Sequence, residues 1–153
     1  MSEDDVEALR TALLESRHRI ACLIQDFETY RRRVERELKN IESRTKERLL
    51  LRILPQIEAL EKAIVVMRRK KVPKSVIKGL QMIIDDMFKS LESEGLEIIE
   101  AVGKRFDPKF HEAVKVVPAN EDNIVLEEVE RGYMLDGRVI KQAKVVVGRK
   151  VTP

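Results

Sequence analysis

Residues 6–34 carry apolar side chains at alternating spacings of three and four. Eight of the nine positions in this series are apolar or aromatic: Val6, Leu9, Leu13, Ser16, Ile20, Leu23, Phe27, Tyr30 and Val34. Such spacing is typical of the a and d positions of a two-helix coiled coil. The series continues through Leu38, Ile41, Thr45 and Leu49 with a stutter, which locally unwinds a left-handed supercoil.

The length of this helical pattern predicts an assembly. Residues 1–54 contain neither Gly nor Pro, and a helix over 4–54 would be about 75 Å long. A compact chain of 153 residues has a radius of gyration of only about 15 Å, so it cannot cover such an edge. We therefore expect a parallel homodimer, with an interface that contains Leu9, Leu13, Ile20, Leu23, Phe27, Tyr30, Val34 and Ile41. The alternative, a hairpin within one chain, lacks a turn, since residues 11–38 contain no Gly, Pro or Asn.

A second helical region follows Pro55, which either kinks the long helix or ends it. Two amphipathic helices are expected, around 56–69 and 75–93, and Gly95 provides a C-terminal stop. Residues 68–78 between them hold six basic residues, no acidic residue and Pro73, so we expect an exposed turn. In a dimer the two helices can pair with their copies as a four-helix bundle, with Ile83 and Met87 in the interface.

From Leu96 onward the apolar period drops to two, and β-branched residues dominate. Candidate strands are 97–102, 113–117, 124–130 and 139–147, and residues 107–108, 118–123 and 132–137 are expected as turns. Residues 121–130 hold five acidic side chains and residues 138–150 hold five basic ones, so neighbouring strands would form cross-strand ion pairs. The pattern predicts an α+β protein with three regions: a dimerising helix over 1–54, a bundle segment over 55–94 and a β-domain over 95–153.

Composition excludes several classes of protein. The net charge of +3 is small for a nucleic-acid-binding protein, and the single Cys22 excludes an internal disulfide. No apolar run approaches the ~20 residues that span a bilayer, and the first residues are acidic, so we expect a cytoplasmic protein without membrane attachment. His18 and His111 lack metal-ligand spacing, and no nucleotide-binding or nucleophile motif occurs. We therefore expect no enzyme activity, metal, cofactor or small-molecule substrate.

Two kinds of segment remain as candidate binding features. Residues 31–33 are three consecutive arginines, which fan over about 300° of a helix and cannot form one phosphate-binding stripe. They fit a solvated coiled-coil flank or a contact with an acidic partner. In the β-domain, Asp107-Pro108 is expected to start a turn, Gly132 and Asp136-Gly137 to shape a hairpin, and Tyr133 to cover the core. These residues alone indicate an elongated dimeric interaction protein, either a scaffold or adaptor or, less well supported, a nucleic-acid-binding protein.

Three segments together resemble the GrpE family, the nucleotide exchange factors of the chaperone DnaK. They are DFETYRRRVERE at 26–37, FDPKFHEAV at 106–114 and GYMLDGRVIKQAKVVV at 132–147, and SEGLEII around Gly95 fits as well. The resemblance covers residues 20–148. It implies a paired long helix, a four-helix bundle and a β-domain on each protomer. The activity that it implies is binding of the nucleotide-binding domain of DnaK, which opens the cleft and releases ADP.

The resemblance also implies roles for individual residues. Contacts with DnaK are expected from Arg31, Arg32, Lys39, Val129, Tyr133, Arg138 and Val147. Lys39 is included because the lysine common in the family falls at Asn40 here. Gly95, Phe106, Pro108, His111, Gly132 and Gly137 are expected to have structural roles.

Overall fold

The computed structural model describes residues 1–151, which form two helices followed by six strands. The helices are α1 (Glu3–Arg69) and α2 (Lys74–Ser93). The strands are β1 (Leu96–Ile99), β2 (His111–Ala119), β3 (Ile124–Glu130), β4 (Gly132–Leu135), β5 (Arg138–Lys141) and β6 (Ala143–Lys150). The predicted α+β class is therefore confirmed. The chain divides into two compact units, Met1–Lys46 and Glu47–Pro153.

The first unit is the N-terminal part of α1, and its start is capped by side chains. The Ser2 backbone N–H donates to Asp5 Oδ2 at 2.9 Å, and the Asp5 N–H donates back to Ser2 Oγ at 3.3 Å. This reciprocal pair is a capping box, which satisfies two of the amide groups that a helix start leaves unbonded. The acidic side chains in the first turn also stabilise the helix, because they interact favourably with the positive end of its dipole.

The second unit begins with the C-terminal part of α1, which continues through Pro55 without a break. Of the two outcomes considered for Pro55, an end of the helix there is wrong. A proline inside a helix removes one hydrogen bond and costs about 3 kcal/mol. Leu54 and Ile57 on either side are almost completely buried, and their packing offsets that cost.

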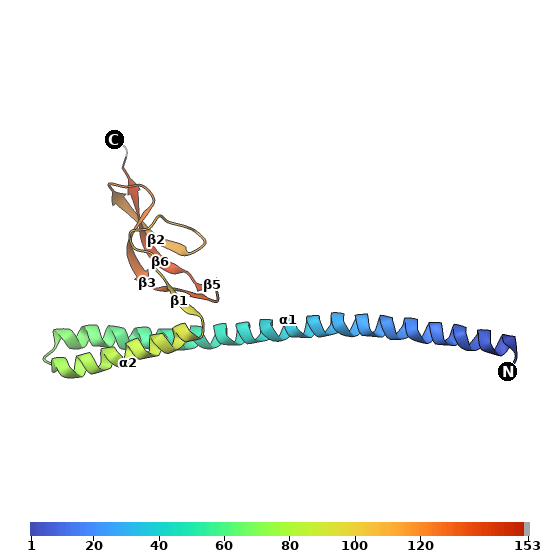
Figure 1. The fold of residues 1–153 in the computed structure, drawn as a ribbon. Helices are drawn as coiled ribbons and strands as arrows, with labels where there is room; N and C mark the ends of the chain where they lie inside the picture. Colours follow the sequence, from blue (N-terminus) through green and yellow to red (C-terminus); the bar gives the residue numbers. More distant parts are fainter. Residues whose placement is uncertain (152–153) are drawn as a thin grey trace. The chain divides into compact units, whose positions relative to one another are not determined.

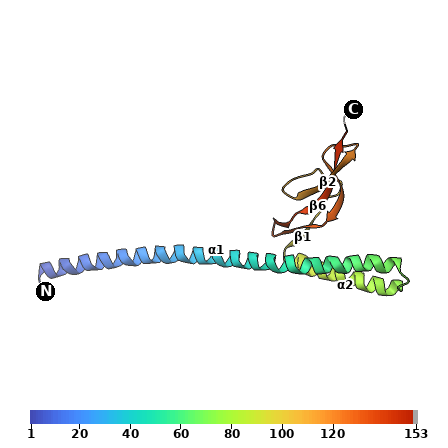
Figure 2. The same cartoon turned by 180° about the vertical axis from the view of Figure 1, so that it is seen from behind.

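The helix α2 lies beside the C-terminal part of α1, as the ribbon shows from both sides (Figure 1, Figure 2). Its bounds agree with the prediction, and Gly95 follows the helix at a φ of 99°. The core between helices and strands contains Leu50, Leu54, Ile57, Ile64, Ile77, Ile84, Phe88, Leu96, Tyr133 and Leu135. The helical pair and the first strands therefore share one hydrophobic core.

The six strands form two three-stranded sheets. One has the antiparallel order β1-β4-β5, and the other has the order β2-β6-β3, in which β6 pairs parallel to β2 and antiparallel to β3. The predicted cross-strand pairing of acidic and basic segments is confirmed. Glu130 lies opposite Lys144 in the ladder, and the Lys144 Nζ is 3.2 Å from Glu130 Oε2.

Two strand predictions need correction. The expected strand over 139–147 is split into β5 and β6, because the chain passes at Gln142 from one sheet to the other. There Gln142 Nε2 donates to the Pro108 carbonyl at 2.8 Å. The expected turn over 132–137 is also too long, since Gly132–Leu135 forms β4 and only Asp136 and Gly137 make the turn.

Candidate functional site

The arginine run lies on the exposed surface of α1, in the first unit. The side chain of Arg31 is 55% exposed, and its guanidinium pairs with Glu28 at 3.0 Å and with Glu35 at 3.9 Å. Exposed pairs of this spacing contribute only about 0.2–0.5 kcal/mol each. The Arg31 guanidinium can therefore exchange these carboxylates for those of a partner at small cost.

The three arginines have different neighbours. Arg32 shares a shallow face of α1 with Glu35, Arg36 and Lys39. The guanidinium of Arg33 instead lies 5.5 Å from the centre of the Tyr30 ring, and its Nε is 4.0 Å from Glu37. This distribution agrees with the argument that consecutive arginines cannot form one stripe. It also brings together Arg32 and Lys39, two of the residues expected to bind a partner.

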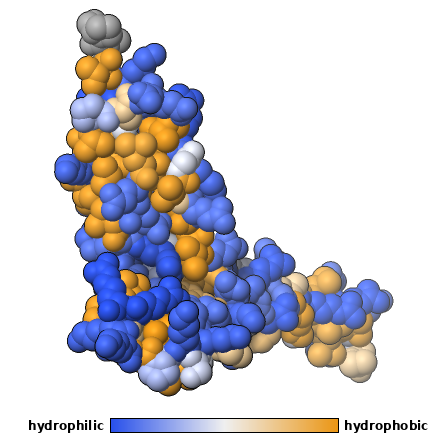
Figure 3. All heavy atoms as spheres, turned by 90° about the vertical axis from the view of Figure 1, so that its left-hand side faces the viewer, coloured by the Kyte–Doolittle hydropathy of each residue, from blue (hydrophilic) through white to orange (hydrophobic). Residues whose placement is uncertain are grey.

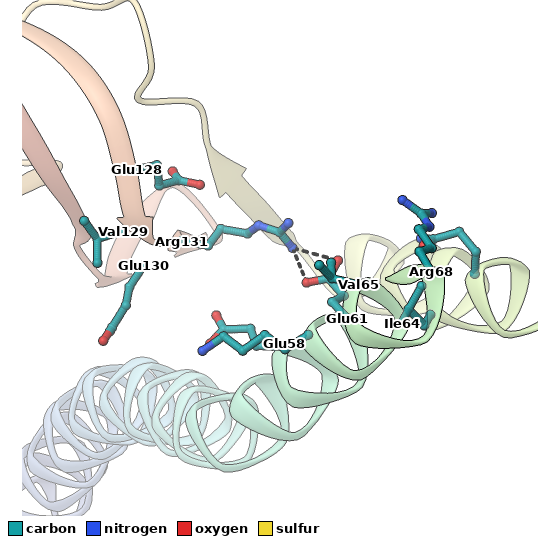
Figure 4. A pocket seen from close by; sticks show the side chains of 11 residues that line it. Glu58, Glu61, Ile64, Val65, Arg68, Glu128, Val129, Glu130 and Arg131 are labelled. Carbon is teal, nitrogen blue, oxygen red and sulfur yellow. Dashed lines mark hydrogen bonds and ion pairs between the residues drawn. The ribbon is translucent and has the colours of Figure 1, made fainter. Parts of the chain in front are cut away.

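In the second unit, Val129 and Val65 are exposed apolar residues that line a hollow of about 360 Å³ (Figure 4). Val129 belongs to β3 and is 54% exposed, and Ile64, Val65 and Arg68 of α1 line the other side. On the face that Figure 3 shows, apolar patches reach the surface along the part of the molecule formed by the strands. Exposed apolar side chains of β2 and β3 are Val114, Val116, Leu126 and Val129.

The other expected contact residues of the β-domain differ in exposure. Arg138 is exposed and forms an ion pair with Glu47 of α1. Tyr133 is completely buried, and Val147 is only 5% exposed, so neither offers side-chain surface to a partner. Tyr133 belongs to the core that joins helices and strands, and Val147 to the core of the two sheets. Both side chains pack in the interior, beneath the exposed surface of the β-domain.

A polar network that the sequence did not reveal surrounds Tyr133. The Tyr133 hydroxyl donates to Glu58 Oε1 at 2.9 Å, and Lys141 Nζ lies 3.5 Å from the same oxygen. Lys141 also approaches Glu130 at 3.7 Å. Residues 58 and 133 are far apart in sequence, and Glu58 lies in a segment where acids and bases alternate. No local pattern therefore distinguishes it from a solvated residue.

Arg131 forms a second link between strands and helices. Its Nη1 donates to both carboxylate oxygens of Glu61, at 3.2 and 3.3 Å, as Figure 4 shows. The same guanidinium lies 5.4 Å from the centre of the Phe88 ring of α2. A cation over an aromatic face is attracted by the ring quadrupole. Arg131 thus contacts both helices from the segment between β3 and β4.

Burial and charge shift the pKa values of the groups around these links. Burial, together with the hydrogen bond to Glu58, raises the pKa of Tyr133. Burial also raises the pKa of Glu128, whereas the hydrogen bond from Lys144 lowers the pKa of Glu130. Tyr133 therefore stays protonated as a hydrogen-bond donor well above neutral pH.

His111 has the surroundings of a structural residue. It is 5% exposed, and its Nδ1 accepts a hydrogen bond from the Asp107 N–H at 3.0 Å. Phe106 and Phe110 lie beside the ring. Burial lowers the pKa of His111, and the Asp107 carboxylate opposes this effect. Pro108 is exposed in the preceding turn and accepts the hydrogen bond from Gln142.

Two glycines lie where an added Cβ would meet a neighbouring residue, a side chain at Gly95 and backbone at Gly132. A Cβ at Gly95 would lie 2.0 Å from Asp136 Oδ1, and the φ of 99° is one that L residues rarely adopt. A Cβ at Gly132 would lie 2.4 Å from the Ala143 backbone nitrogen. Gly137 provides the positive φ of 79° in the β4–β5 turn. These positions fix how α2 meets β1 and how the two sheets meet.

Most residues expected in the dimer interface are exposed on the single chain, along α1 in the first unit and on α2 in the second. Leu9, Leu13, Ile20, Leu23, Phe27, Tyr30, Ile41, Ile83 and Met87 are exposed, and Val34 is half-buried. Apolar side chains that repeat along a helix in this way usually cover one another in a coiled coil.

Among the described residues, no helix is long and apolar enough to cross a membrane. Within the same residues 1–151, no group of three or more potential ligands is placed to hold a metal ion. The candidate contact residues include exchangeable ion pairs on α1 and exposed apolar side chains of the β-domain, and both kinds of group occur in protein–protein interfaces. Fold and site together define an α+β binding protein with a very long N-terminal helix and a small C-terminal β-domain.

Comparison with known proteins identifies the family within this class. The sequence model of the GrpE family matches residues 1–149. This chain belongs to the GrpE family of co-chaperones.

Individual relatives agree with this assignment. Protein GrpE of Bacillus cereus (strain AH820) is 36% identical over 149 residues, which is 96% of this chain and 79% of the relative. Protein GrpE of Bacillus anthracis gives the same values. Protein GrpE of Parageobacillus thermoglucosidasius is 36% identical over 146 residues, covering 94% of this chain and 65% of the relative.

Proposed function

We propose that this chain is a homodimeric nucleotide exchange factor for a DnaK-type chaperone in the cytoplasm. The observation that carries the proposal is its membership of the GrpE family over residues 1–149. The exposed arginine run on α1 and the exposed apolar side chains of the β-domain support it, since both are surfaces that a partner protein can cover.

In this proposal the chain binds the nucleotide-binding domain of DnaK and holds its cleft open. ADP then leaves, ATP enters and bound client protein is released. No bond forms or breaks on the exchange factor itself. The chain must bind the open state more tightly than the closed, nucleotide-bound state, because only a difference in affinity shifts the population. By reciprocity, bound nucleotide must weaken the binding of the exchange factor.

We assign the contacts to two surfaces. On α1 they are Arg31, Arg32 and Lys39, which are all exposed. The guanidinium of Arg31 is held only by weak intrahelical ion pairs. On the β-domain they are Val129 and Arg138. Tyr133 and Val147 were expected among the contacts, but because both are buried we assign them the role of supporting this surface.

The homodimer follows from the exposed apolar edge of α1. Covering apolar area stabilises association by about 25 cal/mol per Å², and a second copy presents a matching edge. We propose that residues 1–54 pair along this edge and that residues 55–94 pair with their copies as a four-helix bundle. The β-domain over 95–153 then remains free to bind the chaperone.

The binding step is tested with the isolated nucleotide-binding domain of DnaK in a calorimetric titration. The wild-type chain should bind the nucleotide-free domain, and an excess of ADP should weaken the affinity at least tenfold. Arg31→Ala and Val129→Asp should each weaken binding to the nucleotide-free domain. Arg10→Ala, which removes an exposed arginine elsewhere on α1, is the matched control. Equal affinity with and without ADP would contradict the exchange mechanism.

A further inference from the structure

The turn between α1 and α2 is the most strongly basic part of the chain, and none of the proposed contacts with the chaperone uses its charges. Residues 68–78 include six cationic side chains, all exposed, and no acidic residue: Arg68, Arg69, Lys70, Lys71, Lys74 and Lys78. None of the six forms an ion pair within residues 1–151, whereas Arg131, Lys141 and Lys144 of the same unit are all paired. Their charge is therefore not neutralised by the protein itself.

Four of these cations surround a hollow of about 520 Å³. Its lining comprises Arg68, Lys70, Val72, Lys74, Ile77, Lys78 and Gln81, with no acidic side chain. Val72 and Ile77 pack against the core between the helices, so they form an apolar floor that is fixed in place. The hollow combines a positive rim with a hydrophobic base.

The backbone of the turn holds this arrangement in one conformation. The Lys70 N–H donates to the Met67 carbonyl at 3.1 Å, and the Val72 N–H donates to the Lys70 carbonyl at 2.8 Å. Pro73 then fixes the backbone before α2 at a φ of −55°. A site that is ordered before binding loses less conformational entropy when it binds.

The charges in the first turn of α2 also favour an anionic partner. Helix starts usually carry Asp or Glu, because the helix dipole is positive there. The first turn of α2 contains no acidic side chain and begins with Lys74. Cationic side chains and the positive end of the dipole repel one another, so a bound anion would relieve an unfavourable local arrangement.

We propose that this hollow binds an acidic peptide segment that carries an apolar side chain. Carboxylates of the peptide pair with Lys70, Lys74 and Lys78 at the rim, and its apolar side chain lies on Val72 and Ile77. A nucleic acid matches the charge but not the floor, since the lining has no aromatic residue on which a base can stack. The peptide is therefore the occupant that fits both features.

Fluorescence anisotropy tests this proposal without any chaperone present, so its failure would leave the proposed function untouched. The probe is a fluorescein-labelled twelve-residue peptide of alternating Glu and Leu. Its dissociation constant should rise at least tenfold for the Lys70→Glu/Lys74→Glu variant and should rise with salt concentration. Arg10→Glu/Arg17→Glu, with the same charge change on α1 outside the basic turn, should leave the affinity unchanged.

Two further probes separate the contributions to binding. A peptide with Ser in place of Leu should bind at least fivefold more weakly, and a labelled twelve-nucleotide oligothymidine should bind more weakly than the Glu/Leu peptide. Circular dichroism checks the fold, and Lys70→Gln/Lys74→Gln replaces the double variant if that variant does not fold. Equal peptide affinity of wild type and basic-turn variant, equal binding of the Ser peptide, or tighter binding of the oligonucleotide would each overturn the proposal.

Discussion

The hydroxyl of Tyr133 is the central polar atom in the core between helices and strands. It donates to Glu58 at 2.9 Å, and Lys141 shares the same carboxylate oxygen. Removing a buried hydrogen-bond donor leaves its acceptor less well satisfied, which costs more than the bond itself contributes. This hydrogen bond thus links β4, which contains Tyr133, to α1, which contains Glu58.

Tyr133→Phe should lower the free energy of unfolding by about 1–2 kcal/mol, because Glu58 loses a buried donor. The measurement is urea denaturation followed by circular dichroism at one fixed protein concentration, since association contributes to stability. Tyr30→Phe is the matched control, because the Tyr30 hydroxyl forms no hydrogen bond within residues 1–151. An equal loss in both variants would contradict the role assigned to the Tyr133 hydroxyl.

His111 should make the β-domain less stable in mild acid. Burial lowers its pKa in the folded state, so the unfolded chain binds a proton first, near the ordinary pKa of about 6.5. The free energy of unfolding therefore falls as the pH drops from above 6.5 towards the lowered pKa of the folded state. Denaturation midpoints between pH 7.5 and 5.5 measure this slope.

Variants of the two histidines test whether His111 causes this pH dependence of the free energy of unfolding. His111→Phe should flatten the pH dependence, because the variant has no imidazole at this position, even though its overall stability falls. His18→Gln, on the exposed surface of α1, should keep the wild-type slope. A slope that persists in His111→Phe would show that another group is responsible.

At the scale of elements, the joint between α2 and β1 depends on Gly95. An added Cβ would lie 2.0 Å from Asp136 Oδ1, at a backbone conformation that disfavours L residues. Gly95→Ala should therefore lower the free energy of unfolding by about 2–3 kcal/mol. Gly79→Ala, inside α2 with nothing within 4 Å of the added atom, should instead raise it by about 0.5–1 kcal/mol. Thermal denaturation of both variants measures the difference, and similar effects would contradict this account.

The elements also show which features the sequence can predict. The apolar spacing predicts the helices and Gly95 predicts the end of α2, because both signals are local. The continuation of α1 through Pro55 depends on the burial of Leu54 and Ile57 in the core that α1 shares with α2, β1 and β4. The passage from β5 to β6 depends on contacts of Gln142 and Ala143 with residues 108 and 110. The local sequence pattern does not predict such long-range contacts.

The candidate site also contains features that the sequence predicts and features that it does not. The family resemblance predicts Arg31 and Val129 as contacts, and both side chains are exposed in the structure. Tyr133 and Val147 were contact candidates as well, but the motifs alone do not show whether these side chains are buried or exposed. The links of Tyr133 to Glu58 and of Arg131 to Glu61 join residues at least 70 positions apart. Only the folded chain brings them together.

At the scale of the whole molecule, the apolar edge of α1 predicts a dimer. Light scattering at micromolar concentration should give twice the chain mass of 17.7 kDa. Leu23→Asp/Phe27→Asp should shift the mass to that of a single chain, because two charges would be buried in the interface. Gln25→Asp, between the interface positions, should remain dimeric. A wild-type mass of one chain would contradict the paired helix.

The release of labelled ADP from DnaK, in the presence of excess unlabelled ATP, tests the central claim most directly. The account predicts that the wild-type chain accelerates release at least tenfold and that Val129→Asp loses most of this effect. Normal binding to DnaK with an unchanged release rate would contradict the account and would favour an adaptor without exchange activity.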